Sequence, residues 1–223
     1  PSIQTINATS ITSNSAILMA NLTDLGGDTS CQVWFEYGET TSYGKTSSKK
    51  TVSSTGTISI SITNLKPDTT YHFRAVAKNS KKTAYGEDKI FTTPPTLPSV
   101  KTMTASNIGY SFATLNGYLS NVGAKSCEVW FVYDTAYHSD WRDYKYSTSK
   151  IVKTSVGSFS YTITGLELNV TYHFRAVANN SAGAVAGNDA TFTTQIILPS
   201  IQTINATSIT SNSAILMANL TDL

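Results

Sequence analysis

The stretch "TYHFRAVA" at residues 70–77 decides the fold of this chain. Its apolar side chains stand at alternate positions, as in Tyr71, Phe73 and Ala75. Alternation with a period of two places these side chains on one face of a β-strand. The same letters return at residues 171–178. A strand that is repeated unchanged predicts a repeated β-domain.

Other repeats surround this strand. Residues 199–223, "PSIQTINATSITSNSAILMANLTDL", match residues 1–25 letter for letter. A diverged copy of the same segment lies at residues 97–119, and "SCQVWFEY" at 30–37 returns as "SCEVWFVY" at 126–133. The exact repeat therefore spans two weaker repeats, so the duplicated object is a pair of domains.

Three units follow from these repeats. We expect one domain over 1–97, a diverged copy over 98–198 with a longer C–C′ loop, and strands A and B of the next repeat over 199–223. Perfect alternation in "TISISIT" at 57–63 marks a further strand. Short strands separated by Gly, Pro, Asn and Asp clusters, without a helical period, predict an all-β chain of tandem sandwiches with about seven strands each.

The segment "NLKPDTTYHFRAVAKN" at 64–79 resembles the E–F turn and F strand of a fibronectin type III domain, an immunoglobulin-like sandwich. A Leu, then Pro-Asp and a Tyr match that family's tyrosine corner, whose hydroxyl bonds to the backbone of the turn. The resemblance assigns this role to Tyr71 and Tyr172. The run "VWFEYGETTSYG" at 33–44 is similar to variants in microbial secreted and cell-surface proteins.

The resemblance covers nearly all of residues 1–198, with one departure. The family usually buries a Trp on strand B, but "AILMANL" at 16–22 has none. The large aromatic stands instead on strand C, as Trp34 and Trp130, where alternation places it on the outer face.

Composition excludes several classes of function. Charged residues are only 13% of the chain and the net charge is +2, which argues against nucleic acid as a partner. No apolar run approaches the ~20 residues of a membrane span, so we expect no membrane insertion in this fragment. The histidines are His72, His138 and His173, two of them at one repeated position. No catalytic, metal or phosphate motif stands out, and we expect no enzyme activity and no cofactor.

The two cysteines, Cys31 and Cys127, occupy equivalent positions with inward parity. Equivalent sites in consecutive domains lie too far apart for a disulfide between them. Two interpretations stay open: buried thiols that act as small core residues, or thiols that bridge separate chains.

Alternation places one tryptophan of strand C and one arginine of the neighbouring strand F on the outer face of each copy. These pairs are Trp34 with Arg74, and Trp130 with Arg175. One interpretation is a guanidinium stacked on an indole as a surface cation–π pair. The alternative is a platform for a ligand or a lateral contact.

A second candidate surface is the loop at 134–150, which is longer in the second copy and rich in aromatic residues. Amphipathic aromatics are typical of contact surfaces. Three interpretations of this loop stay open: it packs locally, it contacts another domain or subunit, or it binds sugars. The candidate contact residues, including two outward positions on strand B of the first copy, are Tyr137, Trp141, Tyr144, Tyr146, Ile17 and Met19.

Asparagine sequons of the form N-x-S/T occur throughout the chain at positions of surface type. They predict a glycoprotein if the chain passes through a glycosylating secretory route. The candidate sites are Asn7, Asn21, Asn169, Asn179, Asn205 and Asn219.

These observations favour a non-catalytic structural repeat of an extracellular filament or cell-surface stalk. The expected partners are other copies of the chain, in a longitudinal array, by lateral assembly or by strand donation, with glycans as a further candidate. One alternative is an adhesin segment that binds glycan or protein through the aromatic loop. The other alternative is a spacer in a secreted polysaccharide-degrading enzyme.

Residues 199–223 leave three explanations open. They are the beginning of a further unit in a continuing array, strands donated to a sandwich in another subunit, or an added tail. Two strands cannot bury a sandwich core by themselves.

Overall fold

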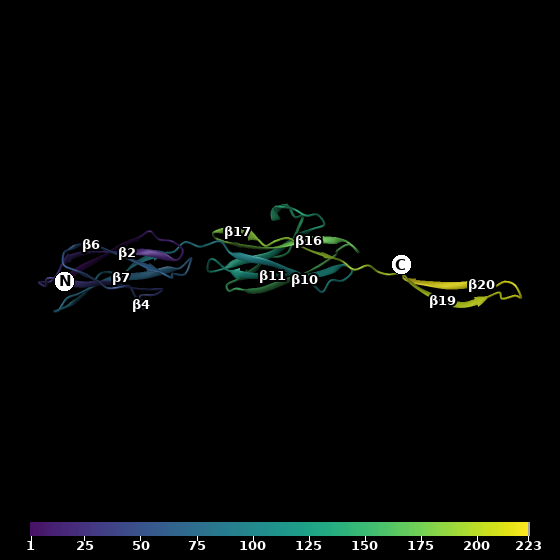
Figure 1. Cartoon of the computed structure of the whole chain (residues 1–223), viewed down its shortest axis with the longest axis horizontal. Coiled ribbons are helices and arrows are strands. Elements are labelled where there is room, and N and C mark those ends of the chain that lie inside the picture. The colour runs from purple at the N-terminus through teal and green to yellow at the C-terminus, as the bar shows by residue number, and fades with distance from the viewer. Residues whose placement is uncertain (223) are drawn as a thin grey trace.

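The computed structural model describes residues 1–222, which form β-strands, short connections and one 3-10 turn. We call residues 1–97 unit one, residues 98–198 unit two and residues 199–222 the C-terminal hairpin. Figure 1 shows the two units and the hairpin following one another along a single long axis. The all-β prediction is confirmed.

Unit one is built from β1 to β9. Their bounds are Ser2–Thr9, Ser15–Asp24, Cys31–Gly38, Lys45–Thr46, Lys50–Val52, Gly56–Thr63, Thr70–Lys78, Thr83–Tyr85 and Lys89–Thr92. One sheet has the order β1-β2-β6, and the other has the order β4-β3-β7-β8. β5 also pairs with β3, and β9 with β7, so each edge of the second sheet is a strand broken in two.

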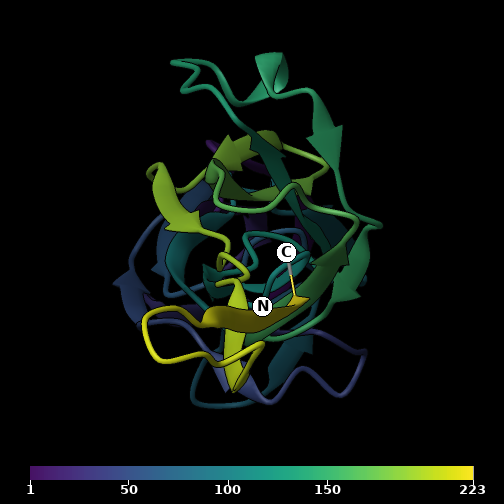
Figure 2. The ribbon, with the colours of Figure 1, turned by 90° about the vertical axis from the view of Figure 1, so that its right-hand side faces the viewer.

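Unit two repeats this topology from β10 to β18. The strand bounds are Ser99–Ser106, Phe112–Asn121, Cys127–Asp134, Tyr146–Ser147, Ile151–Lys153, Gly157–Thr164, Thr171–Asn180, Gly183–Ala186 and Ala190–Thr193. Its sheets have the orders β10-β11-β15 and β13-β12-β16-β17. The 3-10 turn η1, Trp141–Asp143, lies in the loop between β12 and β13. In Figure 2 this loop projects from the body of unit two.

Each unit has its own core between its two sheets. The inward residues of β2 that alternation predicts, such as Leu18 and Leu22, are completely buried. Their counterparts Leu115 and Leu119 in β11 are buried as well. Each unit therefore has the hydrophobic core of an independent domain.

The tyrosine hydroxyls make the bonds that the sequence predicts. The backbone N–H of Lys66 donates to the hydroxyl oxygen of Tyr71 at 2.9 Å. In unit two the N–H of Glu167 donates to Tyr172 at 3.0 Å, although the turn there lacks proline. The corner therefore depends on the tyrosine and the backbone of the turn, and not on the Pro-Asp pair.

A threonine bridges the two sheets in each unit; Thr5 in unit one is buried, and Thr102 in unit two is half-buried. The N–H of Ala75 in β7 donates to the Oγ1 of Thr5 in β1 at 3.0 Å. Next to it, Gly86 separates β8 from β9, and a Cβ there would collide with Thr5. Thr102 accepts the N–H of Ala176 at the same distance in unit two. Glycine therefore separates β8 from β9 at the position where Thr5 approaches the edge of the sheet.

Hydrogen bonds join unit one to unit two. The N–H of Thr96 in the linker donates to the carbonyl of Gly123 at 2.8 Å. The side-chain amide of Asn180 donates to the carbonyls of Thr96 and Val122, both at 2.8 Å. Gly123 lies in the connection after β11 of unit two and has a φ of +70°. A Cβ at this position would collide with the carbonyl oxygen of Thr96, so the close approach of the linker requires a glycine in unit two. The linker is consequently fixed against unit two.

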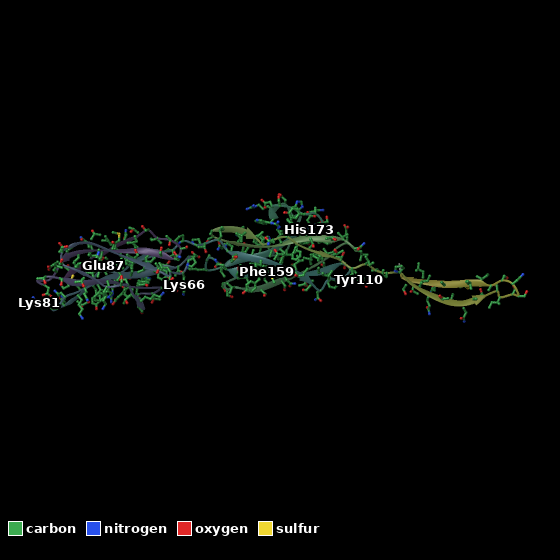
Figure 3. The ribbon with its side chains drawn as sticks, in the orientation of Figure 1. Lys66, Lys81, Glu87, Tyr110, Phe159 and His173 are labelled. Atoms are coloured by element: carbon green, nitrogen blue, oxygen red, sulfur yellow. The ribbon has the colours of Figure 1, made fainter. Side chains whose placement is uncertain are left out.

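The turn of unit one that faces unit two adds one more bond. Asp68 accepts the backbone N–H of Lys125 through Oδ2 at 3.1 Å. Lys66, in the same turn, lies at the end of unit one nearest to unit two in Figure 3. The joint therefore has contacts from both the linker and the domain body.

The C-terminal hairpin consists of β19, Ser200–Thr207, and β20, Ile215–Asp222, which pair with each other. Its register is that of β1 with β2: Ile201 faces Leu220 as Ile3 faces Leu22. Its apolar side chains are exposed over the part of the chain that the structure describes. The segment thus folds as the same hairpin without the rest of a sandwich.

Candidate contact surface

In each unit, the outer face of the six-stranded sheet carries most of the polar and aromatic clusters. In unit one the guanidinium of Arg74 on β7 lies between the rings of Tyr43 and Tyr85, with its carbon 4.9 and 4.3 Å from their centroids. Glu36 is the neighbour of Arg74 on β3. Its Oε2 accepts a hydrogen bond from Nε of Arg74 at 2.8 Å and lies 2.7 Å from Nη2 of the same guanidinium. Arg74 is thus held by two rings and one carboxylate.

Asp88 extends this cluster. Its Oδ1 accepts the hydroxyl of Tyr43 at 3.0 Å, and its Oδ2 lies 2.8 Å from Nδ1 of His72. Inside the cluster Arg74 forms an ion pair with Glu36, and Asp88 is hydrogen-bonded to Tyr43 and His72. These contacts tie the turn before β4 to the edge strand β8 across the outer face.

In unit two the same face lacks the carboxylate. Val132 takes the place of Glu36 opposite Arg175 in the register of β12 with β16. The Nε of Arg175 is buried and has no hydrogen-bond partner in the described part of the chain. Its guanidinium carbon lies 6.0 Å from the centroid of Tyr137, at the limit of a cation–π contact. A buried donor without a partner costs free energy.

The aromatic loop of unit two forms a small core of its own. Trp141 packs edge-on against Trp130 with the centroids 5.7 Å apart. Tyr144 is buried beside Trp130 and Val177. The local packing that was one of the open interpretations is therefore present, and Tyr144 is not available as a surface contact, which corrects that prediction.

Polar bonds anchor the same loop. The hydroxyl of Tyr144 donates to Asp189, which also bonds His173 at 2.7 Å, as the equivalent Asp88 does in unit one. His138 bonds Asp134 at 3.1 Å inside the loop. Figure 3 shows His173 on the side of unit two from which the loop projects. Burial, and then the hydrogen bond to Asp189, raise the pKa of Tyr144 to about 12.

Two loop aromatics remain accessible. Tyr137 is 58% exposed and Tyr146 is 42% exposed. The Nζ of Lys145 lies 5.0 Å from the centroid of the Tyr146 ring. Trp141 is half-buried by its contact with Trp130. The exposed part of the loop that can meet a partner is therefore centred on the two tyrosines.

The cation–π pairs differ from those predicted. Lys49 lies 4.7 Å from the centroid of Trp34, and Lys150 lies 4.9 Å from that of Trp130. Arg74 stacks on tyrosines instead, so the assignment of Arg74 and Arg175 to the tryptophans is wrong. Lys49 and Lys150 lie in the connections immediately before β5 and β14, and from there they reach over the indoles. Both indoles lie on the outer face as predicted, yet they are almost fully covered.

The remaining predicted residues lie as follows. Cys31 and Cys127 are buried in the two cores, and burial raises the pKa of both thiols. That position favours the interpretation as core residues over bridges between chains. Ile17 and Met19 on β2 are half-buried and distant from the aromatic loop of unit two, so they do not form one surface with it.

The sequons occupy varied positions. Asn7, Asn169, Asn205 and Asn219 are exposed. Asn21 is half-buried on β2, and Asn179 is half-buried within β16, where it pairs with Glu128. Asn169 has a positive φ of 54° at the turn that corresponds to the joint-forming turn of Asp68.

Several residues of these clusters were not predicted. These include Tyr43, Asp88 and Asp189. Tyr43 matches the predicted Tyr144 in the repeat, and Asp88 matches Asp189, so this repetition was the signal that could have found them. Within residues 1–222 no group of three or more metal-ligating side chains occurs. In the same range, no helix is long and apolar enough to cross a membrane.

Neither a protein-family model nor a curated protein matches the sequence. Among solved structures, the chain is similar to two forms of the sensor domain of the anti-sigma factor RsgI4 from Pseudobacteroides cellulosolvens. The shorter form is 26% identical, with 42% of this chain and 93% of that chain covered. The longer form is 24% identical, with 51% and 99% covered, and the TM-score is 0.36 for both.

Proposed function

We propose that the chain is a non-catalytic structural segment of an extracellular or cell-surface array, built from fibronectin type III-like domains. The sheet orders and the two tyrosine corners support that domain type. The observation that carries the proposal is the joint, where Asn180 and Gly123 fix the linker of unit one against unit two. Domains fixed end to end make a stiff rod, which suits a filament or stalk.

Small-angle scattering of the full chain tests this proposal. A compact protein of this length would have a radius of gyration of about 17 Å. We expect a much larger value and a distance distribution with the long tail of a rod. A compact particle, or a distribution that fits freely jointed units, would contradict the proposal.

A second function has a specific observation in its favour. The rings of Tyr137 and Tyr146 are exposed on the projecting loop, and Lys145 lies over the ring of Tyr146. An adhesin segment would use it to bind glycan or protein. Glycan-array binding that is lost on Tyr137→Ala and Tyr146→Ala, but kept on Tyr85→Ala in unit one, would favour this function over a purely structural one.

The spacer alternative and glycosylation are tested separately. A catalytic domain for polysaccharides encoded beside these units would favour a spacer.

For glycosylation, the exposed Asn169 and Asn7 are the best candidates, and the half-buried Asn179 is the poorest. If mass spectrometry of the native protein finds Asn169 and Asn7 unmodified, the proposal that the chain is a glycoprotein is wrong.

A further inference from the structure

Arg74 and Arg175 occupy the same position in the two units but have different neighbours. In unit one the carboxylate of Glu36 lies 2.7 Å from a guanidinium nitrogen of Arg74. The ring centroids of Tyr43 and Tyr85 lie 4.9 and 4.3 Å from its guanidinium carbon. Arg74 therefore finds both its counter-charge and its stacking partners inside its own unit.

Arg175 lacks two of these three partners. Val132 stands opposite it where unit one has Glu36, and the register of β16 with β17 places Ala186 where unit one has Tyr85. Among residues 1–222 no carboxylate forms an ion pair with Arg175, and its Nε has no hydrogen-bond partner. The residue as a whole is half-buried, so part of its side chain still meets solvent. A carboxylate supplied from outside would compensate its charge.

The projecting loop does not supply this carboxylate. Asp140 forms its ion pair with Arg142 at 3.0 Å. The pKa of Asp140 is lowered first by a hydrogen bond from the backbone N–H of Arg142, and only after that by the charge of Arg175. Asp189 accepts the hydroxyl of Tyr144. The nearby acidic groups are therefore engaged with other partners.

Tyr137 adds an aromatic surface beside this guanidinium. Its ring is 58% exposed, and its centroid lies 6.0 Å from the guanidinium carbon of Arg175. The imidazole of His173 packs edge-on against the same ring, with 6.0 Å between the centroids. Figure 3 shows His173 on the side of unit two from which the loop projects. A supported, exposed ring next to a cation offers one ligand both an apolar face and a charged group.

We propose that Tyr137 and Arg175 form a binding site for an acidic sugar, a uronate. The sugar ring lies on the phenol ring, and the sugar carboxylate accepts the accessible N–H groups of the guanidinium. A uronate fits better than an acidic peptide, because it carries an apolar ring face and a carboxylate in one residue, whereas an Asp or Glu side chain would leave Tyr137 unused. The proposal rests on the second function given above, glycan binding by the projecting loop, and specifies the class of glycan.

Titration calorimetry of the full chain with charged and neutral forms of the same sugars tests the proposal. The probes are trimers of galacturonate, glucuronate and mannuronate, each paired with its methyl ester, which keeps the ring and removes the charge. We expect at least one acidic trimer to bind, and its ester to bind about tenfold more weakly. Arg175→Met should lower the affinity for the acid to that for the ester, and Tyr137→Ala should weaken both.

The repeat provides matched control variants. Arg74→Met removes the equivalent guanidinium of unit one and should leave the binding unchanged, which excludes a general effect of positive charge. Val132→Glu supplies a carboxylate from within unit two, as Glu36 does in unit one, and should weaken binding of the acid although Arg175 is still present. Thermal unfolding shows whether each variant is folded. If Val132→Glu is not, the comparison of Arg175→Met with Arg74→Met decides.

The outcomes separate this proposal from the function on which it rests. If acid and ester bind equally, or if Arg175→Met binds the acid as wild type does, the uronate site is wrong while glycan binding stands. If a glutamate oligopeptide binds as tightly as the acidic trimers and depends on Arg175, the site recognises an acidic protein and the proposal is overturned. If neither the acids nor the esters bind, the uronate site and the glycan-binding function are both wrong.

Discussion

At the scale of single residues, the hydroxyl of Thr5 takes the place of a strand partner for the N–H of Ala75. Thr5→Val keeps the shape and leaves that buried N–H without an acceptor, which costs about 1–3 kcal/mol. Thr203→Val makes the same change in the exposed hairpin and should alter stability by less than about 0.5 kcal/mol. Urea unfolding of unit one, followed by hydrogen exchange of its peptides, measures both. Equal effects of the two variants would show that the Thr5 bond is not stabilising.

Arg74 and Arg175 give a second comparison between equivalent residues. Arg74→Met leaves Glu36 without its partner and should destabilise unit one by up to about 1 kcal/mol, since the pair is partly exposed. Arg175→Met removes a buried donor that has no partner, so unit two should be as stable as before or more stable by about 1 kcal/mol. Thermal unfolding monitored separately for each unit checks this. A loss in Arg175→Met as large as in Arg74→Met would contradict it.

At the scale of elements, the strands were predictable and the clusters on the outer face were not. The alternation that predicts β6 and β7 is caused directly by one buried face, so "TISISIT" and "TYHFRAVA" give both the element and its orientation. The partners of Arg74 come from a turn and an edge strand distant in sequence. Alternation along a strand predicts the side of the sheet on which a side chain lies, but not which long side chain reaches across that face. For this reason alternation predicts arginines as the cation–π partners of the tryptophans, whereas the structure has lysines there.

The aromatic loop between β12 and β13 should open at high pH because of Tyr144. Its pKa is raised from 10.0 to about 12 in the folded chain, so the neutral form that donates to Asp189 is favoured by folding. The stabilisation is complete below pH 10 and is lost as the pH rises toward 12. We expect tryptophan fluorescence from Trp130 and Trp141 to change over this range, and the change to disappear in Tyr144→Phe. An identical profile in Tyr144→Phe would assign the change to other groups.

At the scale of the whole molecule, the proposed stiffness of the chain depends on a joint that is held by polar contacts. Interfaces of this kind between domains usually permit relative motion. Here the side chain of Asn180 holds the linker carbonyl of Thr96, and Asp68 holds the next unit at Lys125. The proline-containing linker adds restriction of its own. The joint should therefore be fixed by a few named bonds and not by buried area.

Asn180→Ala tests that conclusion, with Asn79→Ala as its control. Asn79 occupies the same position in unit one, where its amide donates to the carbonyl of Leu25, but it holds no linker between units. Both variants lose a side chain that ties a loop, so both should destabilise their own unit by about 1 kcal/mol. Only Asn180→Ala should shorten and broaden the distance distribution in small-angle scattering, because only there does the linker detach. If both variants change the distribution equally, or neither does, the rod is held straight by the linker prolines and not by the amide of Asn180.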